Sequence, residues 1–164
     1  MSELFTDLVY VGIIGSRRRN TLSDLSLVTA MFERVHVPHM TVIVSGGCPT
    51  GGDAFAEYIA DQWAIPKFRY RSRWPIDGIP AECSHMMIHL PDKGTFLETP
   101  ERWRAAKQNY ERNTLIAQDS YDFLIACVAI DRTGGTEDTI KKWLKFRKFR
   151  SEDQAVREGR LILV

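Results

Sequence analysis

Short apolar segments that each end at a glycine-bearing turn and lead into helical periodicity constrain the fold of this chain most. They are Leu8–Ile14, Thr41–Val44 and Tyr121–Ile130. Segments of this length that are rich in β-branched residues are typical of strands buried on both faces of a parallel sheet, and an intervening helix supplies the right-handed crossover between such strands. The pattern therefore predicts an α/β domain in which helices cover both faces of a sheet.

Two weaker segments, Lys67–Tyr70 and Leu161–Val164, are expected to bring the sheet to five strands. We predict a three-layer, Rossmann-like domain with a mostly parallel sheet in the order 3-2-1-4-5, the strands being numbered along the chain. Helices are expected from Thr21 or Ser23 to His36, after Asp53, from Glu101 to about Ser120, and from Thr136. Residues 1–164 are predicted to form one domain with an irregular insertion at about residues 71–100, in which proline and glycine recur and a short helix over Ala81–Leu90 is expected.

The balance of charge limits what the chain binds. With 22 Lys and Arg against 21 Asp and Glu, the formal charge is +1, so no overall field favours nucleic acid or an anionic membrane, and anion binding must be local. No apolar run approaches the roughly 20 residues of a membrane-spanning helix, and we expect no membrane partner. The three cysteines form no CxxC pair, and the first residues lack a basic segment followed by an apolar one, which together favour a cytoplasmic protein.

The glycine-bearing turns carry the strongest functional signal. In an open parallel sheet, ligands bind beyond the carboxyl ends of the strands, where helix N-terminal N–H groups and the helix dipole favour phosphate or carboxylate. A single glycine in such a position is explained by the tight turn that it allows. Three such turns at one edge of a sheet favour anion binding instead. The candidate ligand-binding residues in the turns are Gly15, Ser16, Arg17, Ser45, Gly46, Gly47, Gly51, Gly52, Asp53, Gly134, Gly135 and Thr136.

Charged residues in these turns have expected roles. Arg17 is placed to reach a phosphate, whereas Arg18 and Arg19 are interpreted as a solvated basic turn. Asp53 is expected either to bind ribose hydroxyls or to cap the helix that it opens. The phosphate fingerprints GxxxxGK[ST] and GxGxxG are absent, which disfavours P-loop kinases and ordinary dehydrogenases.

Two other patterns have ordinary structural explanations. Cys83, His85 and His89 place two histidines four residues apart, but no further cysteine or acidic ligands complete a metal site, so no metal or other cofactor is predicted. The basic run at residues 141–150 is interpreted as the solvated face of an amphipathic helix, with nucleic-acid contact as the alternative.

The succession GSR, SGGCPTGGDAFAEYIA, ERNTLIAQDSYDFLIA and GGTEDTI, over roughly residues 8–145, resembles the SLOG superfamily of Rossmann-like proteins. That superfamily includes the bacterial DNA-processing SMF proteins, the Lonely Guy phosphoribohydrolases and small YspA-like proteins, and the likeness is strongest to the last. The resemblance implies a domain that binds a nucleotide or a nucleotide-derived ligand. It assigns to the site Ser45-Gly46-Gly47 with Asp53, Trp74, the pair Arg112-Asn113, and Gly135-Thr136.

The same resemblance supplies an enzymatic alternative. Lonely Guy enzymes remove ribose 5′-phosphate from an adenine nucleotide, using an arginine before strand 4 and a glutamate in a GGxGTxxE turn. Arg112 matches that arginine, but Thr139 stands where the glutamate is expected. Glu137 or Asp138 could replace it as the carboxylate that N-glycosidic cleavage needs, although the helix dipole alone favours acidic residues in a first turn.

We therefore predict a protein that binds a nucleotide or nucleotide derivative, as ligand or substrate, and no cofactor. Phosphate is expected at the glycine turns with Arg17 and Arg112, and ribose at Asp53. The alternatives are a nucleotide N-glycosidic hydrolase, with Arg112 and either Glu137 or Asp138 as catalytic residues, and a protein that binds single-stranded nucleic acid. The base, turnover and the oligomeric state stay open, a homo-oligomer being one alternative.

Overall fold

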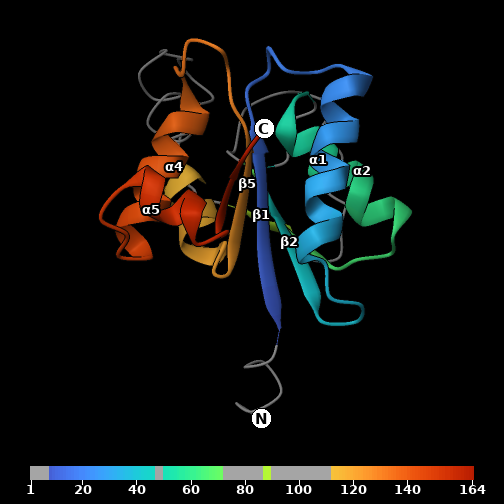
Figure 1. The fold of residues 1–164 in the computed structure, drawn as a ribbon. Coiled ribbons are helices and arrows are strands. Elements are labelled where there is room, and N and C mark those ends of the chain that lie inside the picture. The colour runs from blue at the N-terminus through green and yellow to red at the C-terminus, as the bar shows by residue number, and fades with distance from the viewer. Residues whose placement is uncertain (1–7, 47–49, 72–86, 90–111) are drawn as a thin grey trace, which may run out of the picture.

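The computed structural model describes residues 8–46, 50–71, 87–89 and 112–164 (Figure 1). Its centre is a six-stranded sheet in the order β4-β3-β2-β1-β5-β6, and every neighbouring pair of strands is parallel. The strands are β1 Val9–Gly15, β2 Thr41–Ser45, β3 Lys67–Arg71, β4 Met87–His89, β5 Phe123–Cys127 and β6 Leu161–Leu163. The predicted α/β class and parallel sheet are confirmed.

The predicted number of strands is wrong, and with it the predicted order. The sheet has a sixth strand, β4, which lies outside β3 at the sheet edge. A short helix was predicted over Ala81–Leu90, but Met87–His89 are extended, and residues 81–86 and 90 lie outside the described residues. Three residues are too few to show the period-2 alternation that separates a strand from a helix. The other five strands follow one another as β3-β2-β1-β5-β6.

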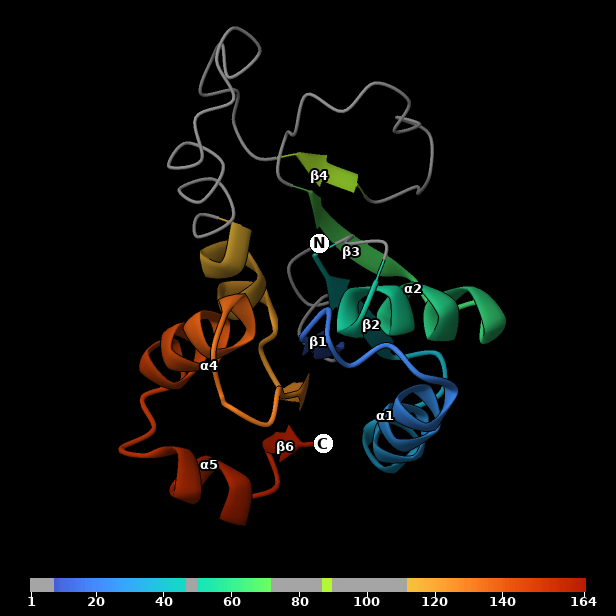
Figure 2. The ribbon, with the colours of Figure 1, turned by 90° about the horizontal axis from the view of Figure 1, so that it is seen from above.

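Helices cover both faces of the sheet. Seen from above, α1 (Leu22–Val35) and α2 (Gly52–Gln62) lie on one side of the strands, and α4 (Gly135–Phe146) and α5 (Glu152–Arg157) lie on the other (Figure 2). Residues 112–119 form a further helical segment on the α4 side. The prediction of α1 is confirmed, with Thr21 as its N-cap and His36 as its C-cap. The prediction missed α5, because it extended a single helix from Thr136 toward Phe149.

Side chains of alternate strand residues pack into two separate clusters. Val11 and Ile13 of β1 face α1 and α2, where Phe32 and Ile59 are also fully buried. The opposite face holds a second cluster, whose members include Ile14, Leu124, Ile116, Ala117, Ile140 and Trp143. Burial on both faces explains why these strands read as continuous apolar segments in the sequence.

The basic run that follows Ile140 is divided between the core and the surface. Trp143 is fully buried, and its indole N–H donates to the Ser120 carbonyl oxygen at 2.6 Å. Arg147 lies over the Tyr121 ring at 4.4 Å and donates to the Gln118 carbonyl oxygen at 2.7 Å. Part of the basic run at residues 141–150 therefore contacts the protein itself, and only the remainder is available to a partner. None of the helices in the described ranges is long and apolar enough to cross a bilayer.

Candidate ligand-binding site

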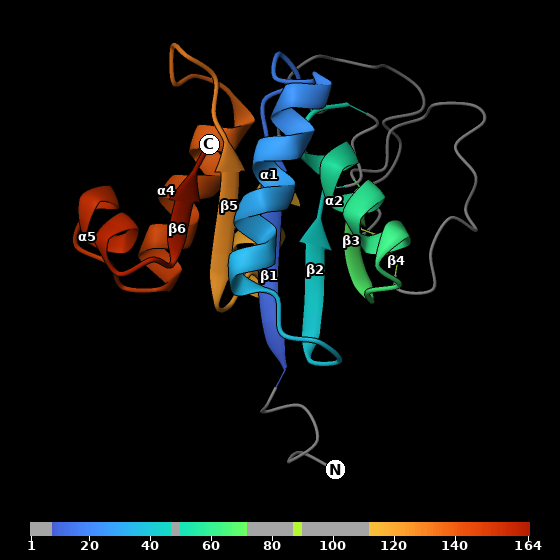
Figure 3. The same ribbon diagram turned by 45° about the vertical axis from the view of Figure 1, so that its right-hand side comes forward.

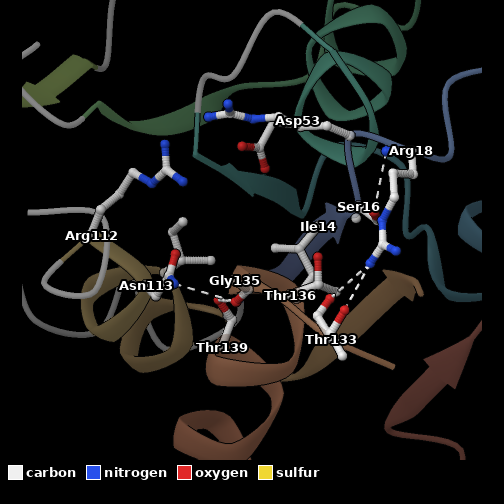
Figure 4. A pocket seen from close by; sticks show the side chains of 14 residues that line it. Ile14, Ser16, Arg18, Asp53, Arg112, Asn113, Thr133, Gly135, Thr136 and Thr139 are labelled. Carbon is white, nitrogen blue, oxygen red and sulfur yellow. Dashed lines mark hydrogen bonds between the residues drawn. The ribbon is translucent and has the colours of Figure 1, made fainter. Parts of the chain in front are cut away.

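The carboxyl ends of β1, β2 and β5 meet at one edge of the sheet, toward which the arrowheads of β2 and β5 point in Figure 3. A cavity of about 350 Å³ opens at this edge. It is lined by Ile14, Gly15, Ser16, Arg17, Arg18, Asp53, Arg112, Asn113, Ile116, Thr133, Gly134, Gly135, Thr136 and Thr139 (Figure 4). The residues predicted for ligand binding that line it are Gly15, Ser16, Arg17, Asp53, Arg112, Asn113, Gly134, Gly135 and Thr136.

The α4 helix begins at this cavity without a side-chain cap. Its N-cap is Gly134, whose φ of +104° lies in the region that favours glycine. By contrast, the side chains of Thr21 and Ser151 cap α1 and α5. The first N–H groups of a helix have no partner within the helix, so those of α4 are left for a ligand beside Gly134–Thr136.

The start of α2 packs against β1 at Gly51 and Gly52, two residues predicted for ligand binding that do not line the cavity. Gly51 has a φ of +74°, and its N–H donates to Asn20 Oδ1 at 2.9 Å. A Cβ on Gly52 would lie 2.1 Å from the Ile14 carbonyl carbon. These glycines therefore bring α2 close to β1, which places the next residue, Asp53, at the cavity.

Ser45 and Gly46, also predicted for ligand binding, support Asp53 and do not line the cavity. The buried Ser45 hydroxyl donates to the Asp53 carbonyl oxygen at 3.3 Å. A Cβ on Gly46 would lie 2.6 Å from Asp53 Oδ2, so glycine leaves room for the carboxylate. Gly47, predicted with them, and Trp74 lie outside the described residues.

Arg112 and Asn113 reach the cavity from the helical segment 112–119 (Figure 4). Arg112 is half-buried, and one of its terminal nitrogens donates to the Gly46 carbonyl oxygen at 3.5 Å. Its Nε is buried and has no hydrogen-bond partner in the described part of the chain. Asn113 is 4% exposed, and its Nδ2 donates to Gly135 O at 3.3 Å and to Asp138 Oδ2 at 3.1 Å. A residue that sequence predicts as a ligand contact thus also fixes the start of α4.

The consecutive arginines after β1 have different surroundings. Arg17 is exposed, lines the cavity and forms no hydrogen bond or ion pair with the described residues. Arg18 also lines the cavity, and its two terminal nitrogens donate to the Asp131 carboxylate at 2.7 and 2.8 Å and to the Thr133 hydroxyl at 2.9 Å. This contact ties the loop after β1 to the loop before α4, and the Arg18 hydrogen bonds lower the pKa of Asp131 to about 2.

The expectation that Arg19 is solvated is wrong. Its side chain is 23% exposed and ion-pairs with Asp24 at 2.7 Å. It also donates to the carbonyl oxygens of Val128 and Val164, at 2.8 and 3.0 Å. Arg19 therefore joins α1, the end of β5 and the last residue of the chain, a set of contacts that residue spacing cannot reveal.

We expect Arg19→Ala to lower the free energy of unfolding by about 2–3 kcal/mol at neutral pH, because it leaves the Asp24 carboxylate and two carbonyl oxygens without their donor. The Arg19 hydrogen bond lowers the pKa of Asp24, so this contribution is full above the ordinary aspartate pKa and is lost as the pH falls through the lowered value. Urea unfolding should show the difference from wild type narrowing below about pH 4. Arg17→Ala is the matched control, because Arg17 forms no hydrogen bond or ion pair with the described residues. If Arg17→Ala changed the free energy of unfolding by more than about 0.5 kcal/mol, the stabilising role would not be specific to Arg19.

The two candidate catalytic carboxylates form ion pairs and do not line the cavity. Glu137 Oε1 accepts a hydrogen bond from Arg132 Nε at 2.8 Å. Asp138 Oδ2 accepts from Lys142 Nζ at 2.8 Å as well as from Asn113. Thr139 does line the cavity, and its hydroxyl donates to Gly135 O at 3.0 Å. The position where the resemblance implies a glutamate thus faces the cavity, but a neutral side chain occupies it.

Sequence reasoning missed five lining residues, which are Ile14, Arg18, Ile116, Thr133 and Thr139. Some of them had a signal: Thr139 follows Gly135 by one helical turn, and Ile14 precedes the glycine at the end of β1. Thr133 also had one, since it begins the glycine turn that leads into α4, whereas Ile116 had none, because its place depends on how the helical segment 112–119 packs.

The described residues contain no group of three or more His, Cys, Asp or Glu side chains placed to hold a metal ion. Of Cys83, His85 and His89, for which the sequence predicts no metal site, the first two lie outside the described residues and only the backbone of His89 is described. Comparison with protein-family models, with curated proteins and with solved structures finds no match for this chain.

Proposed function

We propose that the cavity binds a nucleotide or nucleotide-derived ligand, with its phosphate at the start of α4. One observation carries the proposal: the uncapped helix start at Gly134 lies in the same cavity as Arg17 and Arg112, neither of which has a carboxylate partner among the described residues. Helix N-terminal N–H groups and arginine side chains are the donors that phosphate groups bind best.

The remaining lining residues suit the rest of such a ligand. Asp53 is the one carboxylate among the lining residues, and it is a strong acceptor for ribose hydroxyls. The cavity volume of about 350 Å³ is in the usual range for small-molecule sites. The resemblance to SLOG proteins, which rests on the motifs and not on this cavity, supports the same ligand class.

The contacts of the acidic residues favour binding over hydrolysis. A general acid or nucleophile must reach the glycosidic bond, whereas Glu137 and Asp138 are held by Arg132 and Lys142 outside the cavity lining. Thr139 carries no charge with which to stabilise an oxocarbenium ion. We therefore place the hydrolase second.

Calorimetric titration tests the proposal with AMP, GMP, CMP, UMP and the matching nucleosides. We expect at least one nucleotide to bind, and its nucleoside to bind about 10- to 150-fold more weakly, the scale of a lost charge-assisted hydrogen bond. Failure of all four nucleotides to bind, together with retention on single-stranded DNA at physiological salt, would favour the nucleic-acid alternative.

The same samples decide between binder and enzyme after long incubation. We expect chromatography to detect no free base from any of the nucleotides. Base release that Glu137→Gln or Asp138→Asn abolishes would instead make the hydrolase the leading function.

A further inference from the structure

Asn113 has an amide group whose orientation is fixed. Both acceptors of its Nδ2, the Gly135 carbonyl at 3.3 Å and the Asp138 carboxylate at 3.1 Å, lack a hydrogen to donate. Asp138 is itself ion-paired with Lys142 at 2.8 Å. If the amide were turned over, its oxygen would face two acceptors, so the nitrogen must face them and both of its hydrogens are used.

The other end of this amide has no partner. Asn113 Oδ1 accepts no hydrogen bond from any residue that the structure describes, although Asn113 is only 4% exposed. Asn113 Oδ1 is not among the fully buried unpartnered atoms of the described residues, so this acceptor is accessible from the cavity. Asn113 lines the cavity beside Gly135 (Figure 4), so a cavity ligand is in a position to supply that donor.

A phosphate ester group cannot supply it, because a fully ionised phosphate offers only acceptors. A hydroxyl on the part of the ligand next to the phosphate can supply it, because a hydroxyl has a hydrogen to donate. On the basis of the proposed function, we propose that Asn113 is a specificity-determining residue that selects a hydroxyl-bearing sugar phosphate at this site.

The donors and acceptors that line the cavity are consistent with this arrangement. Arg17, Arg112 and the first N–H groups of α4 offer donors for the phosphate, whereas Asn113 Oδ1 and the Asp53 carboxylate offer acceptors for hydroxyls. In Figure 4, Asn113 and Asp53 lie on different sides of the cavity, so they address different hydroxyls. A simple anion such as sulfate has no hydrogen to donate to Asn113 Oδ1.

The test uses ribose 5-phosphate and its 2-deoxy-2-fluoro and 3-deoxy-3-fluoro analogues as calorimetric probes, with sulfate as the acceptor-only anion. Fluorine is similar in size to a hydroxyl but cannot donate. We expect one fluoro analogue to bind wild-type protein at least tenfold more weakly than ribose 5-phosphate, and we expect this ratio to fall below threefold in Asn113→Ala.

Asp53→Ala is the matched variant, and it keeps the test decisive if Asn113→Ala does not fold. The fluorine effect should persist in Asp53→Ala for the hydroxyl that Asn113 binds. If it disappears there, or if both fluoro analogues bind wild type within threefold of ribose 5-phosphate, the role of Asn113 is refuted while the phosphate site stands. Absence of binding by all the sugar phosphates, together with failure of the four nucleotides to bind, would refute the proposed function instead.

Discussion

Arg112→Ala is expected to weaken nucleotide binding about 10- to 150-fold, the effect of removing a charge-assisted hydrogen bond of about 1.5–3 kcal/mol. Arg112 is half-buried, so its charge is less screened by water and salt than that of an exposed arginine. Its Nε is buried without a partner in the described ranges, and its one hydrogen bond there, to Gly46 O, is a long 3.5 Å. A phosphate within reach therefore offers a better partner than the protein does.

Nucleoside binding separates phosphate recognition from a general loss of structure. We expect Arg112→Ala to change nucleoside affinity by less than threefold. Arg147→Ala is a suitable control, since Arg147 also lies partly buried but donates to Gln118 O, at the amino end of β5 and away from the cavity. Equal losses of nucleotide and nucleoside affinity in Arg112→Ala would show that Arg112 does not act through phosphate.

The strands that position the site could be predicted because each carries its own local signal. The segment Thr41–Val44 is apolar at every position except its first, and β2 extends it by one residue to Ser45. Such a run identifies a strand buried on both faces, and a glycine turn after it identifies the edge where ligands bind. The meeting of Gly15, Asp53 and Gly135 at one cavity follows from parallel pairing alone.

The parts that could not be predicted depend on contacts between distant residues. Glu137 was a catalytic candidate by its place in the first turn of α4, but its charge is taken by Arg132, and Arg132 also pairs with Glu152 in α5. Asp138 was an equal candidate, yet it orients Asn113. Spacing along the sequence shows which helix face a carboxylate occupies and does not show which cation meets it there.

Glycine in this chain has two uses, and the sequence does not separate them. Gly134 needs glycine for its φ of +104°, with open space around the missing side chain, whereas Gly52 needs glycine because there is no space for a side chain. Both were predicted as ligand contacts from the same kind of turn. Substitution by alanine distinguishes the two uses.

Gly52→Ala is expected to lower the free energy of unfolding by about 3 kcal/mol or more, at the upper end of the cost of overpacking. The added Cβ would lie 2.1 Å from Ile14 C, 2.2 Å from Gly15 N and 2.3 Å from Ile14 O. All three are backbone atoms in the central strand β1, so no side-chain rotation relieves the clash and α2 must move away from the sheet. Because Asp53 follows directly in α2, nucleotide affinity should fall in the same variant.

Gly135→Ala provides the matched control, because Gly135 also stands at the start of a helix beside the cavity. A Cβ there meets only Asn113 Nδ2, at 3.4 Å, an ordinary contact. We expect its free energy of unfolding in urea to stay within about 1 kcal/mol of wild type, the range of helix propensity differences. A Gly52→Ala variant as stable as Gly135→Ala would mean that α2 does not pack directly on β1, and the support that this packing gives to Asp53 would have to come from elsewhere.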